Sequence, residues 1–304
     1  MLEITVVALR WLQYSGAVIL LGAPLFLLYS FKGAESPNLA WARPTLIVAA
    51  IVVALGAVAG LVAQTAVMAG SLTEAVKPAS LSFMVSGTAL GMAMVIRAAI
   101  ALLIVATSAI LRPGRTLWNL AAAGGLLVAA SFAWTGHGAA TEGPGGLLHL
   151  AAAIVHAVAA ATWLGALAVL TLLLLRRTVP DDLAIHRALR GFAGMGTVAV
   201  VLLVVTGLVN SWFMVGPARI GDLGTSPYGQ LLIAKLALFG LMLALAAEHR
   251  FRSTPALGTV LGAGEDPRPA IARLRRSVIA ETAVGAALLG LVAWMGTLAP
   301  PSAM

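Results

Sequence analysis

The chain has 304 residues, of which 61% are hydrophobic and only 10% are charged, and its formal net charge is +8 at pH 7. A soluble domain has about 25% charged residues, so this composition excludes a water-soluble globular protein. The apolar segments are continuous rather than alternating, which also excludes a closed membrane β-barrel. We therefore predict an all-α, polytopic membrane protein.

Eight apolar segments are long enough to cross a bilayer core of about 30 Å, which needs about 20 residues per helix. The first is too long for the apolar core of a signal peptide and lacks a charged N-terminal region, so we expect it to be retained. Residues 1–304 then form a single eight-helix transmembrane domain. In chain order, the predicted helices cover residues 5–30, 45–69, 88–111, 116–136, 147–175, 192–215, 229–248 and 276–298.

The basic residues indicate the orientation of these helices. The loops after the second, fourth and sixth segments contain only Lys77 and Arg219. Cytoplasmic loops carry an excess of Lys and Arg, so the richer loops are predicted to be cytoplasmic and both termini to face outward. The loops after the first, third, fifth and seventh segments contain fourteen basic residues: Lys32, Arg43, Arg112, Arg115, Arg176, Arg177, Arg187, Arg190, Arg250, Arg252, Arg268, Arg273, Arg275 and Arg276.

The two halves of the chain, about residues 1–136 and 147–298, resemble each other. Because the repeat unit has four spans, we predict a 4+4 duplication with parallel topology, related by an axis along the membrane normal. Superposition should bring Arg97 near Lys235 and Trp134 near Trp294. The matches, in order, are Leu21-Gly22-Ala23 with Leu164-Gly165-Ala166, Gly60-Leu61-Val62 with Gly207-Leu208-Val209, Gly91 and Arg97 with Gly229 and Lys235, and Ala133-Trp134-Thr135-Gly136 with Ala293-Trp294-Met295-Gly296.

Three of the five histidines are predicted to lie on the outer side. His137 closes the fourth segment, His149 opens the fifth, and His156 follows seven residues later on the same helix face, about 10 Å deeper. The short loop between the segments carries Glu142 and can fold His137 back against the fifth helix. A single such histidine is as often an interfacial or helix-packing residue, but three ionisable groups on one side favour a functional site.

Cysteine is absent, so thiolate metal sites and disulfides are excluded, and any soft-metal ligand must be Met or His. Most methionines lie towards the outer side, and the repeat-related Met68 and Met214 are the best candidate ligands. Thioethers bind Cu(I) well, although methionine is also a common packing residue in apolar helices.

A few charged or polar residues lie within the predicted helices. Arg97 and Lys235 occupy equivalent repeat positions and could meet anions or haem propionates. Glu281 lies nearer the cytoplasmic side, where it could pair with an arginine of the preceding loop. Gln13 aligns with His156 in the repeat. The other two histidines, His186 and His249, lie among cytoplasmic arginines and are predicted to be solvated loop residues.

Motifs for nucleotide binding and for metalloprotease chemistry are missing. The chain has no Walker sequence, no glycine-rich loop after a strand and no His-Glu-x-x-His. We therefore expect a transport or binding protein rather than an enzyme, and none of its energy should come from nucleotide hydrolysis in this chain.

Short motifs across essentially the whole chain resemble the bacterial copper resistance protein D (CopD) family. They are Arg10-Trp-Leu-Gln with Leu21-Gly-Ala-Pro-Leu-Phe26, His149-Leu-Ala-Ala-Ala-Ile-Val-His156 with Trp163-Leu-Gly-Ala, Tyr228-Gly-Gln-Leu-Leu-Ile-Ala-Lys235 with Glu248-His-Arg, Arg275-Arg-Ser-Val with Glu281, and Gly296-Thr-Leu-Ala-Pro-Pro301.

The resemblance implies an inner-membrane protein of copper homeostasis that moves copper from the periplasm towards the cytoplasm. A periplasmic copper-binding partner of the CopC type often accompanies this family. The sequence departs from the family at Gln13, where a histidine is expected, and it shows no evident ligand for copper release on the cytoplasmic side.

The predicted copper ligands are His137, His149, His156, Met68 and Met214, with Gln13, Arg97, Glu142 and Lys235 as possible support. His149 and His156 are too far apart to hold one ion together, because metal–nitrogen bonds are about 2 Å. We expect successive stations, His137 with His149 at the mouth and His156 below. Cu(I) is favoured over Cu(II). The alternatives are a haem-binding redox protein, with two of the histidines as axial ligands, and a membrane partner that only docks a periplasmic copper carrier.

Overall fold

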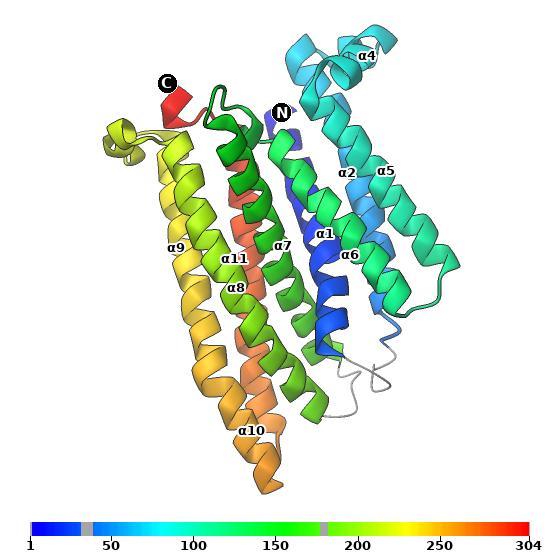
Figure 1. Ribbon diagram of the computed structural model, residues 1–304, viewed down its shortest axis with the longest axis vertical. Coiled ribbons are helices and arrows are strands. Elements are labelled where there is room, and N and C mark those ends of the chain that lie inside the picture. The colour runs from blue at the N-terminus through cyan, green and yellow to red at the C-terminus, as the bar shows by residue number, and fades with distance from the viewer. Residues whose placement is uncertain (1, 32–38, 177–181, 304) are drawn as a thin grey trace.

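The computed structural model describes residues 2–31, 39–176 and 182–303, and this part of the chain is almost entirely helical (Figure 1). Its long helices are α1 (Leu2–Ser30), α2 (Ala42–Ala69), α5 (Ala89–Ile110), α6 (Arg115–Ser131), α7 (Gly146–Arg176), α8 (Asp182–Met214), α9 (Pro227–Glu248) and α11 (Arg268–Met295). Shorter elements connect them: α3 (Leu72–Ala75), α4 (Pro78–Gly87), η1 (Phe132–Trp134), η2 (His137–Ala139), η3 (Pro217–Leu223), η4 (His249–Ser253), α10 (Thr254–Ala263) and η5 (Pro301–Ala303).

The prediction of eight membrane-spanning helices is confirmed, since eight helices among the described residues are long and apolar enough to cross a membrane. Large apolar side chains such as Leu55, Ile110 and Leu208 are mostly exposed on these helices, as contact with lipid requires. The predicted ends differ most in α8, α9 and α11. α8 begins ten residues before the predicted helix, at Asp182, and α9 continues through η4 into α10. Segments predicted as basic loops are therefore largely helical.

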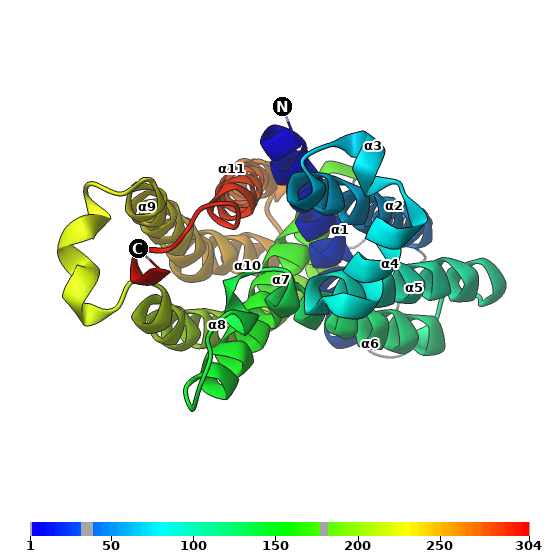
Figure 2. The same ribbon diagram turned by 90° about the horizontal axis from the view of Figure 1, so that it is seen from above.

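Helix α1 is the centre of the bundle (Figures 1 and 2). It packs against α2 and α6 on one side and against α7 and α11 on the other. Its side chains are correspondingly buried, Leu20 and Phe26 completely. One group, α1, α2, α5 and α6, is thereby joined to a second group, α7, α8, α9 and α11, mainly through α1 and α7.

Two glycines allow α1 and α7 to cross in backbone contact. A Cβ atom built on Gly22 would lie 2.5 Å from Cα of Gly165, and one built on Gly165 would lie 2.3 Å from the carbonyl oxygen of Val18. Small residues permit such close approach in membrane helices. These glycines come from the matched Leu-Gly-Ala triplets, so residues predicted to be equivalent lie against each other, as they would beside a two-fold axis.

The third helix of each half begins in the same way. Thr88 caps α5 by accepting a hydrogen bond from the backbone N–H of Gly91 (3.0 Å), and Ser226 caps α9 by accepting one from Gly229 (3.1 Å). A Cβ on Gly91 would lie 2.1 Å from the carbonyl oxygen of Met84, and a Cβ on Gly229 would lie 2.4 Å from that of Leu223. Both glycines thus press against the short helix before them. These shared features favour the predicted duplication, which stays a prediction.

The two halves differ in one respect that concerns function. In the first half α2 packs closely on α5, whereas the corresponding helices of the second half, α8 and α9, make little direct contact. Cavities occupy the space between them. The second half is therefore the open one.

Both termini, α4 and the loop before α7 lie at one end of the bundle, which we call the terminal end, and α10 lies at the other (Figure 1). Helices α8 and α11 begin at that other end, and their first turns carry Arg187, Arg190, Arg268 and Arg273. We call it the arginine-rich end. Lys32 and Arg177, which contributed to the predicted charge bias, lie outside the described residues.

The topology can be tested directly because the chain has no cysteine. We expect single cysteines at the exposed positions Ala139, at the terminal end, and Glu265, at the arginine-rich end, to be labelled from opposite sides of the membrane. In intact spheroplasts, an impermeant maleimide should label Ala139→Cys and spare Glu265→Cys until the membrane is opened. Labelling of both from the same side would exclude this topology.

Candidate functional site

His137 lies in η2, where the chain turns back from α6 towards α7. Its ring is half-buried and meets the ring of Tyr228 edge-on, with centroids 6.3 Å apart. Its Nε2 atom is buried without a hydrogen bond of acceptable geometry among the described residues. Burial lowers the pKa of His137, the carbonyls of Met295 and Leu298 oppose this shift, and Arg10 adds to it. The imidazole is therefore neutral near pH 7, as a metal ligand must be.

His149 and His156 project from α7 towards α8, so the predicted common face is present. The ring of His149 stacks on Phe213 (centroids 4.9 Å apart), and its Nδ1 lies 2.7 Å from the hydroxyl of Thr141. Nδ1 of His156 lies 2.9 Å from the hydroxyl of Thr206. In each case Nδ1 has a hydrogen-bond partner, which leaves Nε2 as the nitrogen that could bind a metal ion.

His137 and His156 line one cavity of about 220 Å³, which we call the His137 cavity. Asn210 and Lys235 also line it, and Oδ1 of Asn210 is buried without a hydrogen bond in the described chain. His149 is not among the lining residues. We predicted that His137 joins His149 at the mouth and that His156 holds the deeper position with Met68 or Met214. His137 and His156 both line this cavity, and the pairing of His137 with His149 stays a prediction.

Two methionine side chains lie beside the His137 cavity. The hydroxyl of Tyr228 donates a hydrogen bond to the sulfur of Met214 over 3.4 Å, and the same tyrosine ring meets His137. Met295 is buried with Tyr228 in one apolar cluster, against which Met214 packs. The repeat-related Met214 therefore lies close to the histidines, and Met295 joins it.

The other candidate residues of the predicted site lie elsewhere. Met68 is 64% exposed on α2, a helix that packs on α1 and α5 rather than on α7. Glu142 is exposed in the loop before α7. Gln13 is buried in the first half, where it accepts a hydrogen bond from Arg97 over 2.7 Å. None of the three lines the His137 cavity.

Arg97 forms hydrogen bonds with several neighbouring segments of the first half. Besides Gln13, it donates to the hydroxyls of Ser131 (2.9 Å) and Thr135 (3.1 Å), and its guanidinium lies 3.7 Å from the centre of the Phe132 ring. Its donors are thus directed at protein acceptors. The haem alternative placed Arg97 and Lys235 beside the propionates of one haem, but Lys235 lines the His137 cavity while Arg97 does not. The arrangement does not fit that haem site.

The prediction that His249 is a solvated loop residue is wrong. His249 is buried in η4, a π-helical turn between α9 and α10, and its Nδ1 lies 3.1 Å from Oε2 of Glu281. Glu281 is completely buried and pairs with this histidine rather than with an arginine. His186 also belongs to a helix, α8, where it is half-buried against Gly258 of α10. The wider spacing of a π-helical turn shifts the His249 side chain inward, which a regular helix pattern does not predict.

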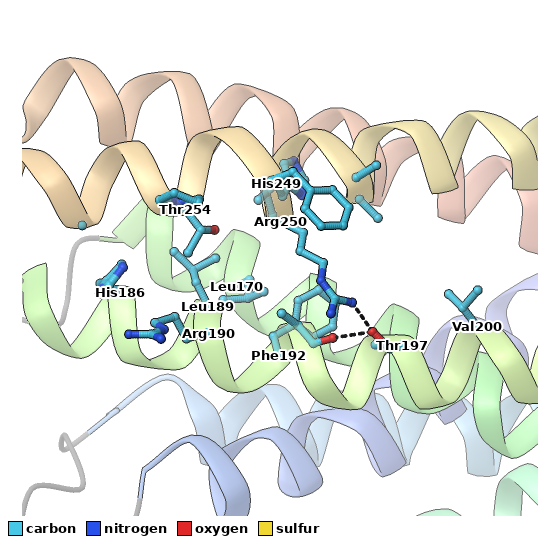
Figure 3. Close-up of a pocket in the computed structure, with 18 of the residues that line it drawn as sticks. Leu170, His186, Leu189, Arg190, Phe192, Thr197, Val200, His249, Arg250 and Thr254 are labelled. Carbon is cyan, nitrogen blue, oxygen red and sulfur yellow. Dashed lines mark hydrogen bonds between the residues drawn. The ribbon is translucent and has the colours of Figure 1, made fainter.

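The His137 cavity lies mainly between α1, α7 and α11, and two further cavities lie between α8 and α9. The His137 cavity shares His156 and Lys235 with a second cavity of about 530 Å³, which Met242 also lines. A third cavity of about 830 Å³, the His249 cavity, lies towards the arginine-rich end and is drawn in Figure 3. Trp163 lines both the second and the third cavity, and its ring packs edge-on against Phe239. This aromatic pair separates the two ends of the series.

The described residues contain no group of three or more His, Asp or Glu side chains arranged to hold a metal ion. The side chains at or near the His137 cavity that can bind a soft metal ion are imidazoles and thioethers.

The whole chain is similar to a curated protein named for copper. Copper resistance protein D of Pseudomonas syringae pv. tomato is 38% identical over 303 residues, which covers 97% of this chain and 96% of that protein. The chain belongs to the copper resistance protein D family. Residues 186–295 match the copper resistance protein D family itself, and residues 1–147 match the family described as copper resistance protein D-like, N-terminal domain. The first range covers the first predicted repeat and the loop after it, and the second range lies within the second predicted repeat.

A second curated protein is similar to a smaller part of the chain. The copper transport protein CutJ of Bacillus subtilis (strain 168) is 33% identical over 126 residues, which is 41% of this chain and 22% of that protein. No solved structure matches the chain. Together with the eight apolar helices, these findings identify a multi-pass membrane protein of a copper resistance and transport family.

Several residues of the site could have been found from spacing. Phe213 and Thr206 on α8 are seven residues apart, as are His149 and His156, and the pairs run in opposite directions along two antiparallel helices. Matching heptad spacings therefore indicated which face of α8 meets the histidines. Nothing in the sequence alone placed Tyr228 beside His137, because that contact depends on how η2 folds over the end of the bundle.

Proposed function

We propose that this chain carries copper from the periplasmic side of the bacterial inner membrane towards the cytoplasm. The terminal end faces the periplasm in this proposal, and Cu(I) enters at the His137 cavity. In this proposal the Nε2 atoms of His137 and His156, which both line this cavity, serve as nitrogen ligands, and the sulfur of Met214, which contacts Tyr228, serves as a thioether ligand. His149 serves as an outer station above them.

One observation carries this proposal: the His137 cavity joins two histidines, one of which has a buried ring nitrogen without a hydrogen bond. Buried polar atoms are normally paired, and the exceptions call for a ligand or a functional role. Among the described residues, the cavity lining contains no carboxylate, which a hard, multiply charged ion would need. Neutral imidazole and thioether groups suit a singly charged, soft ion.

Transport is favoured over a passive docking role by the series of cavities. A protein that only docked a copper carrier of the CopC type would need a surface at the terminal end and no openings deeper in the membrane. Here the cavities continue from His156 past Lys235 and Met242 to Trp163, and beyond it to His249. The Trp163–Phe239 pair is the closure that a moving ion has to pass.

Purified protein in liposomes tests this proposal. Cu(I) is supplied outside under reducing conditions, and an encapsulated Cu(I) indicator reports entry. We expect filling well above that of protein-free liposomes, and filling at background for the His137→Ala, His156→Ala double variant. Stoichiometric Cu(I) binding without filling would contradict transport and support the docking role. A Soret band in the purified protein would instead favour haem.

A further inference from the structure

The strongest unassigned feature lies at the arginine-rich end, far along the helices from the candidate copper ligands. Glu281 of α11 is completely buried in a membrane-spanning helix. Its Oε1 atom has no hydrogen-bond partner in the described chain, and the only partner of Oε2 there is Nδ1 of His249. An ionisable group inside a membrane is costly and usually serves a function. A carboxylate that existed only to join two helices would be expected to have its oxygens satisfied.

Polar contacts connect this carboxylate with the end of the bundle. Oε2 of Glu281 lies 3.1 Å from Nδ1 of His249, and Nε2 of the same ring lies 2.6 Å from the hydroxyl of Ser277. That hydroxyl lies 3.5 Å from Oε2 of Glu248. Glu248 is partly exposed, lies 3.9 Å from Arg273 and accepts a hydrogen bond from Ser253. The contacts thus run from a buried carboxylate to one that solvent reaches.

The backbone at this place favours such a chain. α9 gives way to the π-helical turn η4 at His249, and π-helical turns occur frequently at functional sites. At this turn Glu248 and His249, which are adjacent in sequence, both contact the hydroxyl of Ser277 on α11.

We propose that Glu248, Ser277, His249 and Glu281 form a proton relay that loads a proton onto Glu281 from the arginine-rich end. A proton leaves the carboxyl group of Glu248 for the Ser277 oxygen as the Ser277 hydroxyl proton passes to Nε2 of His249. The proton on Nδ1 of His249 passes to Oε2 of Glu281. One proton is transferred overall, from Glu248 to Glu281, and the steps reverse when Glu281 unloads.

The charged groups around the relay suit this role. Arg273 on α11 faces Glu248. On the cavity side, His186 and Arg190 of α8 and Arg250 of η4 line the His249 cavity together with His249, and Arg250 reaches across to the hydroxyl of Thr197 (Figure 3). On α7, the helix on the other side of α11, the neighbouring polar contact is the neutral Thr171–Thr282 pair (2.8 Å). Towards the terminal end the next turn of α11 is apolar, with Gly285 against Leu164 and Met242. Glu281 is therefore the inner terminus of the relay.

Infrared spectroscopy of the whole protein in liposomes tests the relay without copper. We expect a carboxylic-acid C=O band that disappears in Glu281→Gln and that shifts rapidly on transfer to D₂O. In Ser277→Ala the band should remain, but its exchange should slow on the order of 100-fold, because a proton-transferring group has been removed. Glu248→Gln should slow it similarly. Ser108→Ala, which also removes a completely buried hydroxyl, is the matched control and should exchange as wild type does.

The outcomes separate this proposal from the copper function. Absence of a band that depends on Glu281, or equal exchange rates in wild type and Ser277→Ala, overturns the relay even if liposomes fill with copper. Rapid exchange that is lost in Ser277→Ala and Glu248→Gln supports the relay even if the liposomes do not fill with copper. If the protein has both the relay and the copper transport activity, copper entry should change the pH of the liposome lumen in wild type. This pH change should be lost in Glu281→Gln.

Discussion

Gly165→Ala is expected to destabilise the bundle by about 3 kcal/mol or more, the upper end of what overpacking costs. The new Cβ would lie 2.3 Å from the carbonyl oxygen of Val18 and 2.6 Å from Cα of Gly22. These are backbone atoms, so no side chain can rotate away, and α1 and α7 must separate. Because this crossing joins the two halves, the loss should appear as a lower melting temperature in detergent and as poorer recovery of monodisperse protein.

Gly240→Ala is the matched control. Gly240 lies within α9, and a Cβ there would meet nothing within 4 Å. Alanine is favoured over glycine in a helix by about 0.5–1 kcal/mol, so this variant should be as stable as wild type or slightly more so. An equal effect of the two substitutions would contradict the α1–α7 contact.

The reciprocal variant distinguishes a shared contact from two separate ones. Gly22→Ala directs a Cβ at Cα of Gly165, 2.5 Å away. Once either alanine has forced the helices apart, the other meets less resistance. We therefore expect the Gly22→Ala, Gly165→Ala double variant to cost much less than the sum of the single variants. Additive costs would place the two glycines in different contacts.

Much of the fold follows from hydropathy because a bilayer leaves the backbone few choices. Each apolar segment must satisfy its own hydrogen bonds as a helix, so α1, α2, α5 and α7 begin and end within a few residues of their predicted limits. Hydropathy predicts helix ends less well where the helices leave the membrane. α8 and α10 contain arginines or polar turns that resemble loops in sequence, but these segments pack on each other and remain helical.

The site was less predictable than the fold, for a physical reason. Helical periodicity gives the face on which a side chain lies, which was enough for His149 and His156. It does not predict the neighbour of a residue across a chain reversal. The reversal at η2 places the ring of His137 against Tyr228 and on the same cavity as His156. It also fails at a change of helix type, which is why His249 was assigned to solvent although η4 turns it towards Glu281.

The ligand set of the His137 cavity gives the second large expected effect. His137→Ala and His156→Ala should each weaken Cu(I) binding by about 100-fold, measured by competition with a chromophoric chelator, because each removes a nitrogen ligand without a substitute. His149→Ala should weaken it less, since that ring is held by Phe213 and Thr141 outside the cavity. His186→Ala, at the other end of the molecule, should not change it.

The methionines offer a matched pair for the sulfur ligand. Met214→Leu keeps the volume of the side chain and removes the sulfur beside Tyr228, so we expect Cu(I) affinity to fall by about tenfold. Met68→Leu changes an exposed sulfur on α2 and should leave affinity unaltered. If the two leucine variants bind equally, Met214 is a packing residue and copper is held by imidazole alone.

The pH dependence of binding tests the state of His137. Protons compete with a metal for an imidazole, and an unperturbed histidine begins to lose affinity as the pH falls through about 6.5. Burial holds the pKa of His137 below that value, so its neutral form persists to lower pH. We therefore expect Cu(I) affinity to change little between pH 7.5 and about 6.5, where an ordinary histidine ligand already becomes half protonated. A loss of affinity centred at the ordinary value would show that His137 is solvated, and the cavity would then lack the buried nitrogen on which the copper assignment depends.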